Sequence, residues 1–198
     1  MAEQVVAYRG ICLSEAVEVI ENQKYRAAEE RTFCNDIEIK AVFGPGVYLV
    51  SDYTVAAEYA FCHAEARGDK GSVIRQSLCL QHPLRLDSCF GEKEIRSMAV
   101  AWKYPDGLAE AETMHMESMG FSRWAGSIIR DYVIWRGYDG IIYPIDDGLT
   151  YYIAYRPDEQ IRAMEMDFVY DIWETRFHTF ADLRNRYQAQ PKESFLRE

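Results

Sequence analysis

The sequence predicts an α+β domain in which strands and amphipathic helices alternate along one chain of 198 residues. Three observations predict this class. The apolar run 5–8 is followed at once by a helical pattern. Residues 91–137 show a longer helical pattern with aromatic side chains at helical spacing. Two runs of strand formers, 139–143 and 150–155, flank an Asp-Asp-Gly turn and therefore predict a β-hairpin.

Turn and capping signals place the remaining elements. Gly44-Pro45-Gly46 predicts a turn before a strand at residues 47–50, and Asp52 is expected to cap a helix that closes near Gly68. Ser14 and Ser122 are expected at the starts of two other helices. Further strands are predicted at residues 72–80, 84–87 and 160–166, and an amphipathic helix at residues 168–187. We therefore expect one domain over residues 1–166, with a helical extension over residues 167–198 packed on it.

Composition excludes several classes of protein. A formal net charge of -10 disfavours nucleic acid as a partner, although this argument does not exclude a local patch of basic residues. The five cysteines and four histidines lack zinc-type spacing, so we expect no metal site, and irregular cysteine spacing is typical of reduced, buried thiols in a cytoplasmic protein. No apolar run approaches the ~20 residues of a membrane span, so no membrane partner is expected.

Three separate segments carry a recurring pattern in a fixed order. The first is Tyr8-Arg9-Gly10, at the end of the first strand. The second is Gly44-Pro45-Gly46-Val47-Tyr48, with Tyr59 eleven positions after Tyr48 on the following helix. The third has two parts, residues 137–142 and residues 152–161. In order and spacing these segments resemble the ADP-ribosyltransferase superfamily, especially the branch that includes the poly(ADP-ribose) polymerases and the diphtheria-type toxins.

The resemblance implies a fold and an activity. The fold has two packed, antiparallel-rich β-sheets flanked by helices. The activity is cleavage of NAD, the co-substrate, at the bond between nicotinamide and ribose, without a metal ion. ADP-ribose then passes to a macromolecule, for which we expect a protein, with a nucleic-acid acceptor disfavoured by charge. By analogy alone, a small domain of this kind is expected to act as a bacterial or phage effector or toxin, possessing mono-ADP-ribosyltransferase activity.

The resemblance also assigns roles that suit the residue types. Nicotinamide is a flat aromatic amide, so its site needs stacking faces, for which Tyr48 and Tyr59 are the candidates. Gly10 has no side chain and lets a carboxamide approach the backbone closely. Arg9 offers a permanent cation for phosphate or ribose. Ala56 stands where the family often carries a serine at the carboxamide.

The chain departs from the family pattern at the catalytic acid. Tyr151 occupies the position of the family's glutamate, which stabilises the oxocarbenium-like transition state. Asp147 is the preferred replacement and Asp146 the second choice, although aspartate before glycine is also ordinary turn chemistry. Glu159 is a third candidate, expected in a solvated loop. The alternative stays open that the domain binds NAD, ADP-ribose or a protein without reacting, and that Tyr151 fills the vacated space.

Overall fold

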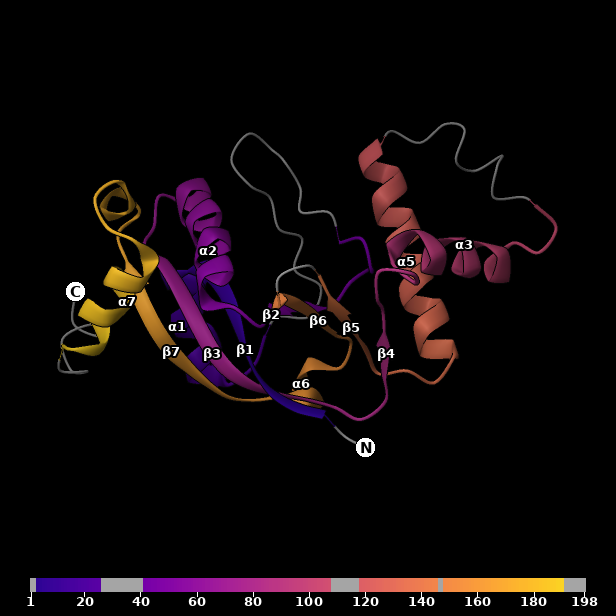
Figure 1. Cartoon of the computed structure of the whole chain (residues 1–198), viewed down its shortest axis with the longest axis horizontal. Helices are drawn as coiled ribbons and strands as arrows, with labels where there is room; N and C mark the ends of the chain where they lie inside the picture. The colour runs from indigo at the N-terminus through magenta and orange to yellow at the C-terminus, as the bar shows by residue number, and fades with distance from the viewer. Residues whose placement is uncertain (1–2, 26–40, 108–117, 146–147, 191–198) are drawn as a thin grey trace.

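A computed structural model describes residues 3–25, 41–107, 118–145 and 148–190. Its strands form one seven-stranded mixed sheet with the order β4-β5-β6-β2-β1-β3-β7 (Figure 1). The strands are β1 (Glu3–Cys12), β2 (Val47–Val50), β3 (Gly71–Leu80), β4 (Pro83–Arg85), β5 (Gly140–Pro144), β6 (Thr150–Ala154) and β7 (Ile161–Tyr170). All neighbouring pairs are antiparallel except β4 and β5, which are parallel. The predicted α+β class is confirmed.

Helices cover both faces of this sheet. The helices of the described residues are α1 (Leu13–Asn22), α2 (Tyr53–Arg67), α3 (Glu92–Lys103), α5 (Ser118–Trp135), the short α6 (Pro157–Gln160), the 3-10 helix η3 (Ile172–Arg176) and α7 (Phe180–Gln188). Figure 1 shows α2 beside β1 and β3, whereas α3 and α5 lie together at the opposite end of the sheet, beyond β4.

The sheet consists of two blocks joined at one point. In one block, β1 pairs with β3 along its whole length, from Glu3 opposite Leu80 to Cys12 opposite Gly71. In the other block, β2 pairs with β6 and β6 with β5. A single pair, Tyr8 opposite Val50, joins β1 to β2. The expectation of two packed sheets is therefore wrong: the blocks lie edge to edge, because this pair makes them one continuous sheet.

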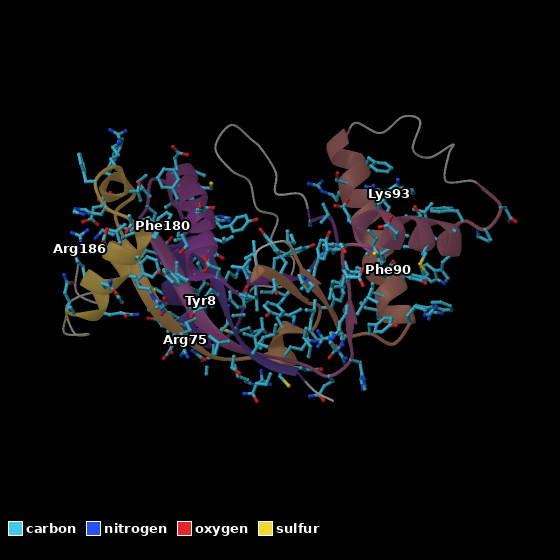
Figure 2. All side chains as sticks on the ribbon, viewed as in Figure 1. Tyr8, Arg75, Phe90, Lys93, Phe180 and Arg186 are labelled. Carbon is cyan, nitrogen blue, oxygen red and sulfur yellow. The ribbon has the colours of Figure 1, made fainter. Side chains whose placement is uncertain are left out.

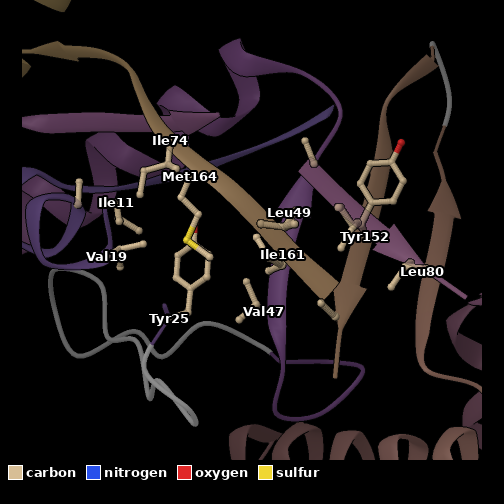
Figure 3. Packing of buried hydrophobic residues seen from close by; sticks show 14 of the residues in the cluster. Ile11, Val19, Tyr25, Val47, Leu49, Ile74, Leu80, Tyr152, Ile161 and Met164 are labelled. Atoms are coloured by element: carbon tan, nitrogen blue, oxygen red, sulfur yellow. The ribbon is translucent and has the colours of Figure 1, made fainter. Parts of the chain in front are cut away.

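Three apolar clusters form the core, one on one face of the sheet and two on the other. The first contains Tyr25, the α1 residues Ala16 and Val19, and the inward side chains of most strands (Figure 3). On the opposite face, one cluster packs α3 and α5 against β5 and β6, and it includes Ile95, Ile129 and Ile153. The other packs α2 and α7 against β1, β3 and β7, and it includes Ala56, Ala60 and Phe168. We call the cluster under α3 and α5 the α5 cluster, and the cluster under α2 and α7 the α2 cluster.

The structure confirms some of the predicted helix ends and corrects others. The Asp52 carboxylate accepts hydrogen bonds from the backbone N–H of Thr54 and Val55, so the predicted cap of α2 is confirmed. Gly68, with φ +62°, ends that helix as predicted. Ser14 is not the cap of α1, which begins at Leu13. Instead, the Asp69 carboxylate accepts from the Ser14 N–H.

The hairpin is confirmed, and the C-terminal helix is corrected. In the hairpin, Pro144 lies opposite Thr150 and Tyr143 opposite Tyr151. The helix predicted from residue 168 is wrong at its start, because β7 continues to Tyr170 and places Phe168 opposite Val73 of β3. The expected boundary between residues 166 and 167 thus falls inside a strand of the sheet. As far as residue 190, where the described chain ends, η3 and α7 form the helical part that follows.

Candidate functional site

The candidate site lies where the two blocks of the sheet separate. Beyond the pair Tyr8–Val50, no ladder in the described chain joins β1 to β2. Gly10 lies two residues past this pair on β1, and Tyr48 lies two residues past it on β2. The two segments that carry the first parts of the family pattern therefore begin side by side and then lose their backbone pairing.

Tyr59 of α2 and Tyr151 of β6 meet beside this separation. Their hydroxyl oxygens lie 3.1 Å apart, within hydrogen-bond distance, and both side chains are half-buried in the α2 cluster. Helix α2 supplies Tyr59 because Asp52 fixes its first turn, and the hairpin supplies Tyr151 through its register with β2 and β5. Segments ninety-two residues apart thus place two phenols in direct contact.

The environment keeps the Tyr59 phenol protonated. Burial raises the pKa of Tyr59, and the hydrogen bond and charge interaction with Tyr151 raise it further. Neutral phenols both donate and accept hydrogen bonds, so the pair can offer one donor and one acceptor to a third polar group. A carboxamide presents the complementary pair, an N–H donor and a carbonyl acceptor.

Tyr48 packs away from this pair. Its hydroxyl donates to the Gly44 carbonyl at 2.7 Å and accepts from the Phe43 N–H at 3.2 Å, and its ring packs against the α5 cluster. Burial raises the pKa of Tyr48. Among the described residues, no ring contact joins Tyr48 to Tyr59. The structure thus brings Tyr59 together with Tyr151 in the α2 cluster, whereas Tyr48 packs against the α5 cluster and the turn before β2 holds its hydroxyl.

Gly10 permits a close approach of helix and strand. A Cβ atom at this position would lie 1.7 Å from the Ala56 carbonyl oxygen and 2.6 Å from the Ala60 nitrogen. Ala56 is fully buried at the same contact. The backbone of α2 therefore covers Gly10 from the face of the sheet. On that face the helix backbone leaves no room for a ligand beside Gly10.

Arg9 lies on the other face of the sheet, so the structure does not bring it to Tyr59 and Tyr151. Successive side chains of a strand point to opposite faces, and Arg9 shares its direction with Ala7 and Ile11 of the first cluster. Its guanidinium lies 4.3 Å from the Tyr25 ring centroid, and the residue is only 6% exposed. Strand alternation thus places this cation on the face opposite to Tyr59 and Tyr151.

Of the three candidate carboxylates, the structure describes Glu159. Asp146 and Asp147 lie outside the described residues, between strand ends that the Ile145–Leu149 backbone hydrogen bond holds together. Glu159 lies in α6, is mainly exposed and forms an ion pair with Arg156 at 3.4 Å. Within the described ranges, no group of histidine, cysteine, aspartate and glutamate side chains has the arrangement of a metal site.

Sequence reasoning missed the neighbours that frame the tyrosine pair. Tyr143, Tyr151, Val50 and Tyr8 lie opposite one another in register across β5, β6, β2 and β1. The Asp-Asp-Gly turn fixes the hairpin register and would have predicted that Tyr143 faces Tyr151. Nothing in the sequence indicates that Tyr155 donates its hydroxyl to the Phe43 carbonyl, and this bond anchors the turn before β2.

Comparison with known proteins adds no family to this picture. No protein-family model matches the chain, and no curated protein matches it. Within the part of the chain that the structure describes, no helix is long and apolar enough to cross a membrane.

Proposed function

We propose that this chain is a mono-ADP-ribosyltransferase that cleaves NAD between nicotinamide and ribose and transfers ADP-ribose to a macromolecule, most simply a protein. The observation that carries the proposal is the contact between Tyr59 and Tyr151 beside the separation of β1 from β2. It joins the second segment of the family pattern to the residue directly before residues 152–161 of the third, and Tyr8 of the first lies two strands away in register.

In this proposal the tyrosine pair recognises the nicotinamide moiety. Tyr59 supplies an aromatic face, and the two hydroxyls match the carboxamide. Gly10 contributes backbone where β1 and β2 part, whereas Ala56 only packs α2 against it. Tyr48 supports β2 through the 43–44 turn and does not stack on the ring. Arg9, on the opposite face, makes no direct contact with the dinucleotide.

The developing positive charge on ribose needs a carboxylate, because a nearby anion stabilises an oxocarbenium-like transition state. Asp147, and after it Asp146, are proposed for this role from their place in the sequence. They precede Tyr151 by four and five residues in the same hairpin. Since Pro144 pairs with Thr150, the turn that contains both aspartates adjoins the end of β6 that carries Tyr151.

One observation favours a second function, binding without turnover. At the position of the family's glutamate, the chain has a phenol whose hydroxyl is already engaged by Tyr59. A neutral phenol cannot supply the negative charge that the reaction needs. In that case the domain recognises NAD or ADP-ribose and does not cleave it.

Incubation of the full chain with labelled NAD and a cell lysate separates the two functions. Transferase activity predicts steady nicotinamide release and label on an acceptor, both lost in Tyr59→Ala and retained in Tyr53→Phe, a hydroxyl deletion on the same helix. The carboxylate is then tested with Asp146→Ala and Asp147→Ala. Full rates of nicotinamide release in both variants would refute the proposed catalytic role of these two residues. Absence of release together with saturable NAD binding would establish the second function, and absence of both would refute the proposal.

A further inference from the structure

A cavity with charged walls lies at the β7 edge of the sheet, between β7 and helix α7. Its volume is about 330 Å³, which is in the range of small-molecule sites, about 300–1,000 Å³. Four charged side chains line it, Arg75 of β3, Glu165 and Asp167 of β7, and Arg184 of α7. Figure 2 shows Arg75 beside Tyr8 on the strands next to α7.

Its inner wall is a preorganised ion pair. The Asp167 carboxylate contacts two nitrogens of the Arg184 guanidinium, Nε at 2.7 Å and Nη2 at 2.9 Å. The Asp167 side chain is only 4% exposed, and the guanidinium lies 4.1 Å from the Tyr53 ring centroid. The two-point contact and the ring fix the orientation of Arg184, and its remaining nitrogen, Nη1, retains N–H donors beyond this contact.

Its outer wall is an ion pair with unused bonding capacity. Arg75 and Glu165 lie opposite each other on β3 and β7, with 2.6 Å between Nη1 and Oε1. Their side chains are 44% and 56% exposed, so water screens the pair and it is weak. A guanidinium has five N–H donors and a carboxylate about four acceptor sites, so both groups can bind a ligand while they stay paired.

We propose that this cavity binds a small zwitterion of the α-amino-acid class. The two walls together carry two positive and two negative charges, so a ligand with one charge meets repulsion as well as attraction. A ligand with both charges can place its carboxylate at Arg75 and its ammonium at Glu165. The C-terminal end of α7 favours the same placement of the cation, because Gln188 and Gln190 of the lining lie where the helix dipole is negative. An uncharged side chain on the ligand completes the charge balance.

Calorimetric titration of the full chain with each of the common L-amino acids tests this inference. The tightest of them is then compared with its N-acetyl form, which lacks the ammonium, and with its amide, which lacks the carboxylate. We expect saturable binding of the free amino acid and at least a tenfold weaker affinity for both capped forms. Equal affinity for the N-acetyl form would indicate an anion site and overturn the proposal, as would no saturable binding of any amino acid at millimolar concentration.

Variants locate the binding in this cavity. Arg75→Gln removes the positive charge proposed to bind the ligand's carboxylate, and Glu165→Gln removes the negative charge proposed to bind its ammonium. Both side chains are exposed, so each variant should keep the fold and bind the amino acid at least tenfold more weakly. Arg186→Gln is the matched control, because Arg186 is an exposed arginine of α7 that is paired with a glutamate, Glu174, as Arg75 is with Glu165, and is absent from the lining. Unchanged affinity in both cavity variants, or an equal loss in the control, would refute the assignment.

Discussion

Replacing Gly10 by alanine tests how closely α2 packs on β1. The added Cβ would lie 1.7 Å from the Ala56 carbonyl oxygen, and ordinary contact begins at 3.4 Å, so the two must separate by 3.4 - 1.7 = 1.7 Å. The obstacle is helix backbone, which cannot rotate aside as a side chain does. Overpacking a core costs about 1–3 kcal/mol, and we expect the upper end, about 3 kcal/mol, because all of α2 must move. This is a large part of a total stability of about 5–15 kcal/mol.

The assay is urea unfolding followed by tryptophan fluorescence, compared with a second glycine-to-alanine variant. Gly120 of α5 has no atom within 4 Å of an added Cβ, so Gly120→Ala should leave stability unchanged or raise it by up to about 1 kcal/mol. The two variants make the same chemical change, but Gly10→Ala should lower the midpoint and Gly120→Ala should not. A loss below about 1 kcal/mol in Gly10→Ala would refute the close packing.

Three further predictions concern capping, pH and the buried ion pair. Asp52→Ala removes the acceptor of two backbone N–H groups of α2 and should cost about 0.5–2 kcal/mol in urea unfolding, and an unchanged midpoint would contradict the capping role. Burial raises the pKa of Tyr170, so the folded state keeps a proton that the unfolded state loses above about pH 10. The free energy of unfolding should therefore fall above that pH by up to about 1.4 kcal/mol per pH unit from this group, and Tyr170→Phe should reduce the slope; equal slopes would count against it. Asp167→Asn should cost about 2 kcal/mol in thermal unfolding because Arg184 loses its buried partner. Glu174→Gln, which breaks an exposed pair between η3 and α7, should cost less than about 1 kcal/mol, and equal losses would refute the distinction.

Local chemistry made part of the fold predictable. Asp52 and Gly68 mark the two ends of α2 because capping and left-handed backbone depend on a few neighbouring residues. The hairpin was predictable for the same reason, since its turn fixes both strands. By contrast, the strand that ends at Tyr170 was mistaken for a helix, because the tail mixes aromatic and charged residues and its strand pairing with β3 involves residues almost a hundred positions away.

The candidate site was only partly predictable, because it depends on the direction of side chains in a sheet. Tyr151 was singled out as a substituted position, but its contact with Tyr59 follows from the packing of α2 on the hairpin block. Arg9 and Gly10 are adjacent in sequence and lie on opposite faces, so a motif of neighbours does not imply a shared site. Whether two blocks join as one sheet or pack as two rests on the single pair Tyr8–Val50, which no sequence pattern specifies.

The central claim is that a nicotinamide dinucleotide binds against Tyr59 and Tyr151. The most direct measurement is an NMR titration of the ring-labelled tyrosines with NAD, with both resonances assigned through Tyr59→Phe and Tyr151→Phe. The account predicts that these two rings shift and saturate together, while Tyr187, which lines the cavity between β7 and α7, stays unchanged. If NAD at millimolar concentration leaves both rings unmoved, or perturbs only tyrosines elsewhere, the claim is contradicted.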